Sequence, residues 1–294
     1  LDPSPELIAL GRILVEPGVT DLVCNGHRHL QVLRGGTWLT LPSPFKSAEA
    51  LEGLARELAR SAGRRLDLTM PFANFALGSE LRVHLVLASA ISAKTLLSMR
   101  VLAKRHFGLG ALVQIGMLDE VARSRLTQLI RSGASILISG ASGSGKTTLL
   151  RALLSEASEQ RIIALEDVPE LQLEAESFLS LVSRPANTEG KGAIELNALL
   201  IETLRMRPDR IVVGEIRAKE MITMLQAANS GHAIAATIHA NSVSAVLERM
   251  VSIGLASSIG ETAIQSLAKA IDAYIHIEVL DSKRRLHILE SISK

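Results

Sequence analysis

The residues best suited to chemistry lie in a glycine-rich loop between residues 140 and 147. The loop reads GASGSGKT, which fits the pattern G-x-x-x-x-G-K-[ST]. Glycines allow backbone N–H groups to turn toward an anion, and a helix starting after the loop directs its positive end at the same anion. We therefore predict a nucleotide-phosphate loop, with Lys146 on the β- and γ-phosphates and the Thr147 hydroxyl on Mg²⁺. The residues expected to contact the nucleotide are Gly140, Ser142, Gly143, Ser144, Gly145, Lys146, Thr147 and Thr148.

Acidic residues follow two further apolar runs. Glu215 ends the apolar run of "DRIVVGEIR" (209–217), and Glu166 and Asp167 end that of "ALEDVPEL" (164–171). The carboxyl ends of parallel strands meet at the sheet edge where phosphates bind, so Glu215 could orient or deprotonate the attacking water. Glu166 and Asp167 indicate either Mg²⁺ or water coordination or an ordinary turn, and the residues alone favour neither.

Two histidines flank another apolar run, in "NSGHAIAATIHANS" (229–242). His232 lies just before the predicted strand and His239 at its end. Lone histidines are usually structural, but one at the end of a central strand beside a phosphate loop could sense the γ-phosphate. Metal ligation is disfavoured because the single cysteine, Cys24, is far away in sequence and no third ligand has suitable spacing.

Strands and helices alternate from residue 120 onward, and this alternation predicts how the polar residues are positioned. It is typical of a largely parallel sheet with helices on both faces. The closing segment, "AYIHIEVL" followed by "RRLHILES", indicates a hairpin. The predicted strands are 135–139, 161–165, 210–214 and 234–238, and the predicted helices are 120–132, one from Lys146, 195–206, 219–229, 243–252 and 259–270.

The first hundred residues are predicted to form a smaller α+β domain. An amphipathic helix is expected over 47–60, with Ser47 as its cap. The segment "AKRHFGLGALVQIGMLD" (103–119) has three glycines and no clear period, so residues 106–119 are interpreted as a linker. The expected strands are 22–24, 30–33, 74–77, 81–89 and 95–101, and the expected domains are 1–105 and 120–294.

Composition narrows the class of protein. Hydrophobic residues make up 47% and aromatic residues only 2%, so the core must be aliphatic, as suits α/β layers. The net charge of +2 gives no sign of a strongly nucleic-acid-binding protein. A single cysteine fits a reducing cytoplasm. No apolar run approaches the roughly 18 residues needed to span a bilayer. The chain starts at Leu1 without a methionine, so we expect its natural N-terminus to be missing.

Five segments occur in a recognisable order: "GASGSGKTT", "IIALEDVPEL", "RPANTEGKG", "LRMRPDRIVVGEIR" and "GHAIAATIHANS". Together they resemble the type II/type IV secretion ATPase superfamily. Its hallmarks are a Walker A loop, an aspartate box, an atypical Walker B motif ending in Gly-Glu, and a histidine box. The third and fourth segments favour the branch of CpaF-like motors of tight-adherence (Tad) pili, with type IV secretion ATPases as near relatives. The resemblance covers residues 1–280 and is most specific in 135–250.

The resemblance implies an α/β protein with a C-terminal RecA-like P-loop ATPase domain and a smaller N-terminal α+β domain, assembled as a homo-hexamer. It implies Mg²⁺-dependent hydrolysis of ATP that powers pilus assembly or secretion across the bacterial envelope. The implied partner is a platform protein of the inner membrane, without direct contact to nucleic acid. The implied location is cytoplasmic, with peripheral association at the inner face of the cytoplasmic membrane.

The resemblance also assigns roles to single residues. Glu166 helps to place Mg²⁺ and water, and Glu215 is the general base beside the same metal ion. His232 and His239 fill the histidine box. Arg82 and Arg100 match N-domain positions that in relatives close over the phosphates. Further basic candidates near the site or the subunit seam are Arg184, Arg205, Arg207 and Arg217, among which Arg205 is preferred.

The implied mechanism converts hydrolysis into motion. Loss of the γ-phosphate removes an anion that the arginine-bearing domain and the ATPase core share, so the domains can swing on segment 103–119. Two alternatives stay open. A RecA-like helicase or recombinase should have a basic stripe and stacking aromatic residues, which this composition disfavours. A nucleotide-gated scaffold would bind ATP without hydrolysis, which intact Lys146, Glu166 and Glu215 disfavour.

Overall fold

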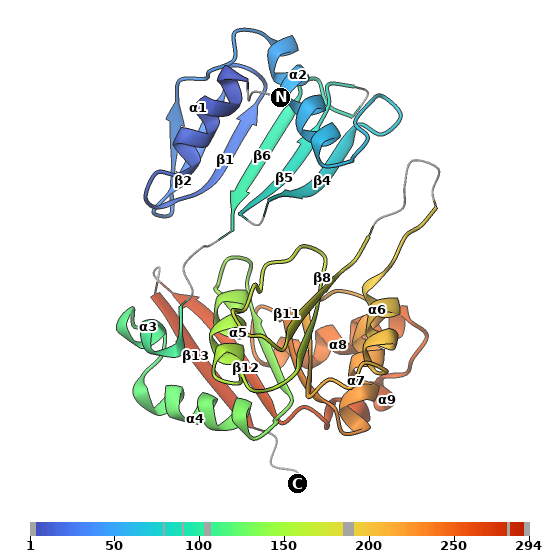
Figure 1. Ribbon diagram of the computed structural model, residues 1–294. Helices are drawn as coiled ribbons and strands as arrows, with labels where there is room; N and C mark the ends of the chain where they lie inside the picture. The colour runs from blue at the N-terminus through green and yellow to red at the C-terminus, as the bar shows by residue number, and fades with distance from the viewer. Residues whose placement is uncertain are drawn as a thin grey trace. The chain divides into compact units, whose positions relative to one another are not determined.

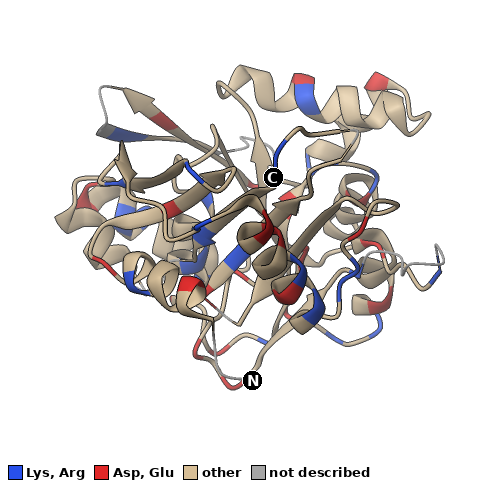
Figure 2. Ribbon diagram, turned by 90° about the horizontal axis from the view of Figure 1, so that it is seen from above, with Lys and Arg blue, Asp and Glu red and all other residues tan. Residues whose placement is uncertain are grey.

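The chain forms two compact units, Leu1–Arg105 and His106–Lys294, in the computed structural model (Figure 1). The structure describes residues 4–78, 80–89, 91–102, 107–184, 191–280 and 283–290. Among them, no helix combines the length and the apolar character that a membrane span requires. Figure 2 shows acidic and basic residues interspersed along the described ribbons.

The first unit is a six-stranded antiparallel sheet with two helices. Its helices are α1 (Pro5–Leu14) and α2 (Ala48–Ser61), and its strands are β1 (Val19–Asn25), β2 (Leu30–Arg34), β3 (Thr37–Leu41), β4 (Phe72–Leu77), β5 (Leu81–Val86) and β6 (Leu96–Val101). The strand order is β3-β2-β1-β6-β5-β4. Both helices contribute to one apolar cluster with alternate strand residues, which leaves the other set of strand residues on the opposite face.

The first unit confirms the predicted α+β class and differs in one helix, α1, and one strand, β3, which were not predicted. Helix α2 begins at the expected cap, since the Ser47 hydroxyl accepts a hydrogen bond from the Ala50 N–H. Residues 1–45 were expected to form only short strands, but Pro5–Leu14 is helical. The signals were present: the Ser4 hydroxyl accepts from the Leu7 N–H, and Pro5 occupies the first turn, where its missing N–H costs nothing.

The second unit is a seven-stranded sheet with seven described helices. Its strands are β7 (Ile136–Gly140), β8 (Ile162–Glu166), β9 (Phe178–Val182), β10 (Arg210–Ile216), β11 (Ala233–His239), β12 (Ala273–Leu280) and β13 (Lys283–Glu290), and its helices are α3 (Leu109–Gln114), α4 (Glu120–Arg131), α5 (Lys146–Ser155), α6 (Leu196–Thr203), α7 (Glu220–Asn229), α8 (Ser244–Ala256) and α9 (Glu261–Ala268). The strand order is β13-β12-β7-β11-β10-β8-β9. All neighbours pair in parallel except β12 and β13, which form the predicted hairpin.

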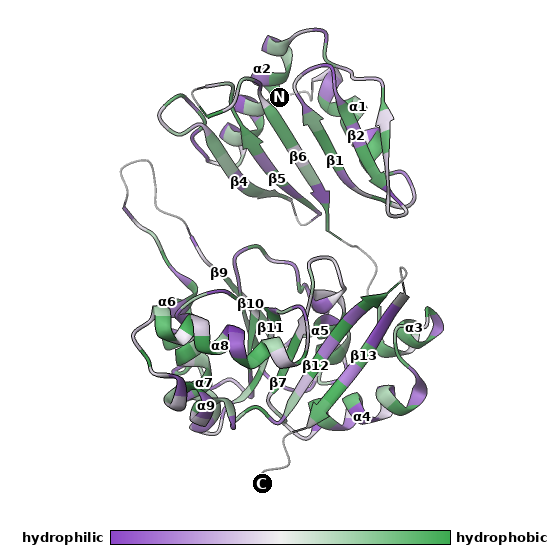
Figure 3. Cartoon of the chain, turned by 180° about the vertical axis from the view of Figure 1, so that it is seen from behind, coloured by the Kyte–Doolittle hydropathy of each residue, from purple (hydrophilic) through white to green (hydrophobic). Residues whose placement is uncertain are grey.

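Helices cover both faces of this sheet, as the alternating pattern predicts. Helices α3, α4 and α5 share one buried cluster with Ile136 and Ile138, whereas α6 to α9 share another with Leu137. Alternate residues of one strand thus feed opposite layers. Figures 1 and 3 view these layers from opposite sides. The predicted α/β class is confirmed, and β9 is a strand that the sequence pattern did not reveal.

The segment interpreted as a linker, 106–119, differs from that expectation in its described part from 107 onward. Helix α3 lies within it, and the buried Leu109, Leu112 and Met117 belong to the core of the second unit. Two of its glycines lie at the ends of this helix, since Gly108 is the N-cap and Gly116, with φ +72°, follows the C-cap, and Gly110 lies within the helix. Residue 106 lies outside the described residues.

Candidate active site

The glycine-rich loop follows β7, whose five residues are all buried, and ends where α5 begins. Gly140 has φ +152°, and a Cβ there would lie 2.7 Å from both the Ile277 carbonyl oxygen and the Ser144 Oγ. Gly145, the N-cap of α5, has φ +104°. Both positions therefore require glycine, one for close backbone approach and one for its backbone conformation. The loop leads directly into the amino end of α5, where Thr147 and Thr148 lie in the first turn.

Two polar side chains of this loop, Lys146 and Ser144, are available to contact an anion. Lys146 is 8% exposed as a residue, and its ammonium donates to the Gly140 and Ala141 carbonyls at 2.9 and 2.8 Å. Burial lowers the pKa of Lys146, and the Glu215 carboxylate acts in the opposite direction. The Ser144 Oγ is buried and has no hydrogen-bond partner among the described residues. A loop with an orphaned hydroxyl and a cation bonded only to its own carbonyls fits a phosphate group.

Glu215 reaches the same edge through an irregularity in β10. The pairing of β10 with β11 shifts between Val213 and Ile216, and the Thr237 hydroxyl donates to the Gly214 carbonyl at 2.6 Å. Such a bulge redirects a side chain at the end of a strand. The Glu215 carboxylate accepts from the Arg217 Nε at 2.8 Å. Glu215 is the second-last residue of β10, so it lies within the strand rather than just beyond it. It is at the carboxyl edge of the sheet, as predicted.

Arg217 joins the two acidic motifs. Besides Glu215, its guanidinium donates to Asp167 at 3.3 Å, and Asp167 also accepts from the Ser183 hydroxyl at 2.7 Å. Burial disfavours the charge on Arg217, but the hydrogen bond to Glu215 and the surrounding carboxylates raise its pKa overall. Arg217, named as a seam candidate, thus lies beside the candidate base of its own chain.

Glu166 is buried and accepts several hydrogen bonds, which the sequence did not predict. Its carboxylate is buried and accepts from the Glu170 and Leu171 N–H groups at 2.8 and 3.0 Å. It also accepts from the Ser180 hydroxyl at 3.0 Å. Burial raises the pKa of Glu166. The residue therefore holds the turn after β8 in place.

No cluster of three or more His, Cys, Asp or Glu suited to a metal ion is found within the described ranges. In the magnesium chemistry of phosphate loops, one hydroxyl or carboxylate acts together with phosphate oxygens and water. Thr147 in the first turn of α5 and the carboxylates of Glu166 and Glu215 are the groups that fit such a partial ligand set.

The two histidines lie at opposite edges of the sheet. His239 ends β11 and pairs in register with Gly140, so it lies at the phosphate edge. Partial burial and then the Lys146 charge lower its pKa. His232 precedes β11, and its Nδ1 lies 3.3 Å from the Ala227 carbonyl at the end of α7. A strand of seven residues spans about 20 Å, so His232 is not brought to the loop within one chain.

The preferred seam arginine also lies away from the loop in its own chain. Arg205 follows α6 and precedes β10, which places it toward the amino edge, and it pairs with Glu202 at 3.4 Å. Arg207 lies in the same connection with φ +53°. Arg184 follows β9 and donates to the Gly192 carbonyl at 2.8 Å. Part of the segment "RPANTEGKG", residues 185–190, lies outside the described residues.

Arg82 and Arg100 are directly opposite each other on β5 and β6 of the first unit. Arg100 also pairs in register with Asp21 on β1, and its Nε donates to that carboxylate at 2.8 Å. The Arg82 Nε lies 3.5 Å from the Asn74 Oδ1. These residues form a polar row on the first unit's sheet, across the four neighbouring strands β1, β6, β5 and β4.

The β12–β13 hairpin carries residues that contact the loop and its preceding residue and that were not predicted from the sequence. His276 is buried, and its Nδ1 lies 2.9 Å from the Ser139 Oγ, directly before Gly140. Burial lowers its pKa, and so does His287, whose ring centroid is 6.4 Å away. Arg284 Nε donates to the Ser144 carbonyl at 2.9 Å. The signal available was only a hairpin, and register decides which of its residues face the loop.

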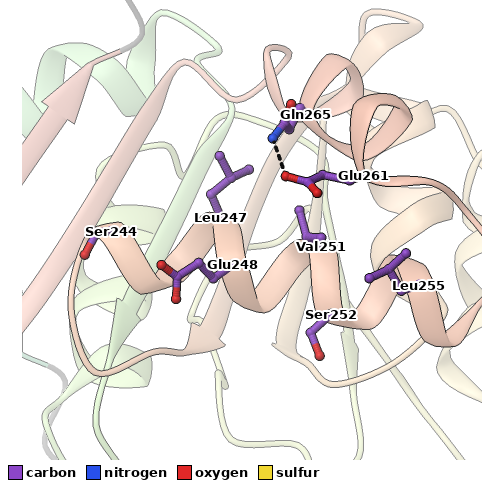
Figure 4. A pocket seen from close by; sticks show the side chains of 8 residues that line it. All are labelled: Ser244, Leu247, Glu248, Val251, Ser252, Leu255, Glu261 and Gln265. Carbon is purple, nitrogen blue, oxygen red and sulfur yellow. Dashed lines mark hydrogen bonds between the residues drawn. The ribbon is translucent and has the colours of Figure 1, made fainter.

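A hollow of about 540 Å³ lies between α8 and α9, away from the residues described above (Figure 4). Leu247, Val251 and Leu255 of α8 line it together with Glu261 and Gln265 of α9. The Gln265 amide donates to Glu261 at 2.9 Å across its rim. None of the candidate site residues lines this hollow, so it is distinct from the phosphate loop.

The chain and its fold have clear counterparts among known proteins. The family described as "Type II/IV secretion system protein" matches residues 43–290. A putative conjugal transfer protein of Mycobacterium tuberculosis is 36% identical over 274 residues, covering 90% of this chain and 78% of that protein. The type IV secretion system protein VirB11 of Bartonella quintana is 28% identical and covers 83% and 79%.

Solved structures show the same fold at lower identity. The pilus retraction motor PilT with bound ADP superposes with a TM-score of 0.71 at 19% identity, covering 99% of this chain and 84% of that one. The VirB11 ATPase of Brucella suis, in complex with sulphate, gives 0.52 at 23% identity and covers 97% and 93%. The chain belongs to the type II/IV secretion system protein family and has the fold of its P-loop ATPases.

Proposed function

We propose that the protein is a Mg²⁺-dependent ATPase that works as a hexameric motor for pilus assembly or secretion across the bacterial envelope. The observation that supports this most is the phosphate loop between β7 and α5, with buried Lys146, the orphaned Ser144 hydroxyl, and Glu215 at the same sheet edge. Family membership supports the cellular role, because relatives are named for conjugal transfer and type IV secretion.

In the proposed reaction the loop N–H groups and Lys146 hold the phosphates while Glu215 positions the attacking water and accepts its proton. Thr147 and Glu166 or Glu215 would hold Mg²⁺, which would supply positive charge beside the phosphates. Arg217 orients the Glu215 carboxylate through its hydrogen bond. His239, whose lowered pKa favours the neutral ring, contacts the γ-phosphate from the end of β11.

The motor step that we propose uses the arginine row of the first unit. Arg82 and Arg100 would engage the γ-phosphate while it is present and lose this contact on hydrolysis. Arg205 is assigned to a neighbouring subunit's site, because in its own chain it lies toward the opposite edge of the sheet. His232, which contacts the end of α7, keeps only a structural role in this proposal.

The setting that we propose is the cytoplasmic face of the inner membrane, on a platform protein and without direct contact to nucleic acid. Segments such as "LRMRPDRIVVGE" favour a tight-adherence pilus motor, and the named relatives keep conjugal transfer and type IV secretion as the neighbouring roles.

The test combines light scattering with an ATPase assay. The expected result is a shift to six-subunit mass with a non-hydrolysable ATP analogue and Mg²⁺, together with phosphate release that EDTA abolishes. A chain that stays monomeric at every concentration would remove the ring from the proposal. DNA-stimulated turnover with steep salt dependence would favour the helicase alternative instead.

A further inference from the structure

The hairpin of β12 and β13 touches the phosphate loop at three places. The Ile277 carbonyl oxygen is so close to Gly140 that a Cβ there would lie 2.7 Å away. His276 Nδ1 and Ser139 Oγ lie 2.9 Å apart just before the loop. Arg284 Nε donates to the Ser144 carbonyl at 2.9 Å near its far end. The first two contacts follow from the parallel pairing of β12 with β7, whereas the third depends on one side chain of β13.

The hydrogen bond from Arg284 to the Ser144 carbonyl also constrains the orientation of the Ser144–Gly145 peptide plane. The Ser144 C=O and the Gly145 N–H belong to one planar trans peptide, so they point in opposite directions. A guanidinium that holds the C=O on the hairpin side therefore directs the Gly145 N–H away from the hairpin. Gly145 is the N-cap of α5, and a phosphate at this helix end is bound through such N–H groups.

This peptide precedes a glycine, so its orientation depends on a restraint from outside the loop. Gly145 has φ +104°, and glycine populates positive and negative φ with similar ease, so the plane between Ser144 and Gly145 can rotate at little cost. A rotated plane would aim a carbonyl oxygen at the phosphate. The side of Gly145 that faces Arg284 is also close-packed, since a Cβ there would lie 3.6 Å from the Arg284 Nε and 3.5 Å from the Met117 Cε.

From this geometry we infer that Arg284 is a positioning residue for nucleotide binding, which fixes the Ser144–Gly145 peptide with its N–H toward the β-phosphate. The inference rests on the proposed ATPase function and adds a residue outside the four motifs. Arg284 acts through the peptide and so contributes to the binding of ATP and ADP alike. Its loss should raise KM without a matching fall in kcat.

The adjacent arginine provides a matched control. Arg284 and Arg285 are both exposed, and successive residues of a strand point to opposite faces. Arg285 pairs in register with Glu278, whereas Arg284 pairs with Val279. Arg285→Ala removes the same charge from the same strand and leaves the bond to Ser144 intact.

The experiment measures the Kd for Mg²⁺·ADP by calorimetry and the kcat and KM for ATP, in wild type, Arg284→Ala, Arg284→Lys and Arg285→Ala. For Arg284→Ala we expect about a tenfold rise in both Kd and KM, as the loss of a charged hydrogen bond gives, with kcat within about threefold. Arg284→Lys keeps a cationic donor and should recover at least half of this loss on a logarithmic scale. Arg285→Ala should match wild type within about twofold.

Each other outcome has a defined meaning. If Arg284→Ala binds ADP within twofold of wild type, the inference is wrong, and it is equally wrong if Arg285→Ala weakens binding as much. Thermal unfolding in parallel identifies a general loss of structure, and if Arg284→Ala does not fold, Arg284→Gln is judged by the same limits. A wild type that neither binds ADP nor hydrolyses ATP would instead refute the proposed function itself.

Discussion

At the amino edge of the second sheet, Arg210 is completely buried, whereas at the carboxyl edge Lys146 keeps partners only within its own loop. Arg210 donates to groups from four separate segments: the Gln160 Oε1 at 2.9 Å and the Ile130, Ala134 and Ile234 carbonyls at 2.8, 2.8 and 3.3 Å. Burial lowers its pKa to about 10. Both are buried cations without a paired carboxylate among these bonds, yet only the loop partners of Lys146 can give way to an anion.

The difference teaches how a structural cation can be told from a functional one. A structural cation donates hydrogen bonds to buried acceptors of several elements, so its removal lowers the free energy of unfolding. A functional cation is held by a few groups of a single turn and stands beside unsatisfied polar atoms, here the Ser144 hydroxyl. Mutations at the two edges should therefore separate loss of activity from loss of stability.

The largest effect is expected from Lys146→Ala. The loss of the cation at the phosphates should lower kcat/KM for ATP by about 10³-fold, while the melting temperature stays close to that of wild type, because only two loop carbonyls lose a donor. Phosphate release and thermal unfolding provide the two readouts. Full turnover in this variant would show that the loop is not part of the ATP-hydrolysing site.

The opposite pattern is expected from Arg210→Met. Methionine roughly fills the space but leaves buried carbonyls without donors, so the free energy of unfolding should fall by about 3 kcal/mol. Chemical denaturation measures the loss, and kcat per folded molecule, at a temperature where the variant is folded, should stay within about twofold. A stable but inactive variant would contradict the division between the edges.

The two histidines sharpen the same comparison on one strand. His239→Ala should lower kcat about tenfold, since a group at the phosphate edge is lost. His232→Ala should leave kcat within twofold and cost at most about 1 kcal/mol, since its ring contacts only the end of α7. Steady-state kinetics of both variants tests this, and equal kinetic losses would show that His232 acts at a site after all.

Architecture and loop were predictable from sequence because their signals are local. The alternation of apolar runs with helical periods predicts the layers, and the glycine pattern predicts the strand–loop–helix unit around Lys146. The hydrogen bond from Ser180 to the Glu166 carboxylate was not predictable. Ser180 lies 14 residues away on β9, a strand whose sequence has no clear pattern.

Burial of charge was the other feature that sequence could not provide. Arg210 stands at the start of an apolar run, where a solvated arginine is the usual expectation. Its burial depends on the ends of α4 and β11 meeting at this edge, which is a tertiary property. Arg284 likewise becomes informative only through the register of β13 on β12.

The smallest effect concerns pH and His276. Its pKa is lowered in the folded state, so between that pKa and the unfolded value near 6.5 the unfolded chain binds more protons, and stability falls as pH falls. His276→Gln should make the decrease in melting temperature from pH 7.5 to pH 5 shallower by a few degrees. Exposed His84→Gln on β5 serves as the control, and an unchanged slope for His276→Gln would contradict the assignment.

The most direct measurement is single-turnover phosphate release by Glu215→Gln, with the affinity for a non-hydrolysable ATP analogue measured on the same sample. We predict a rate at least about 100-fold below wild type with affinity within threefold, because the glutamine keeps the shape of the side chain but cannot accept the proton. Equal rates in the two proteins, whether both fast or both negligible, would contradict the account of a hydrolytic site at this edge.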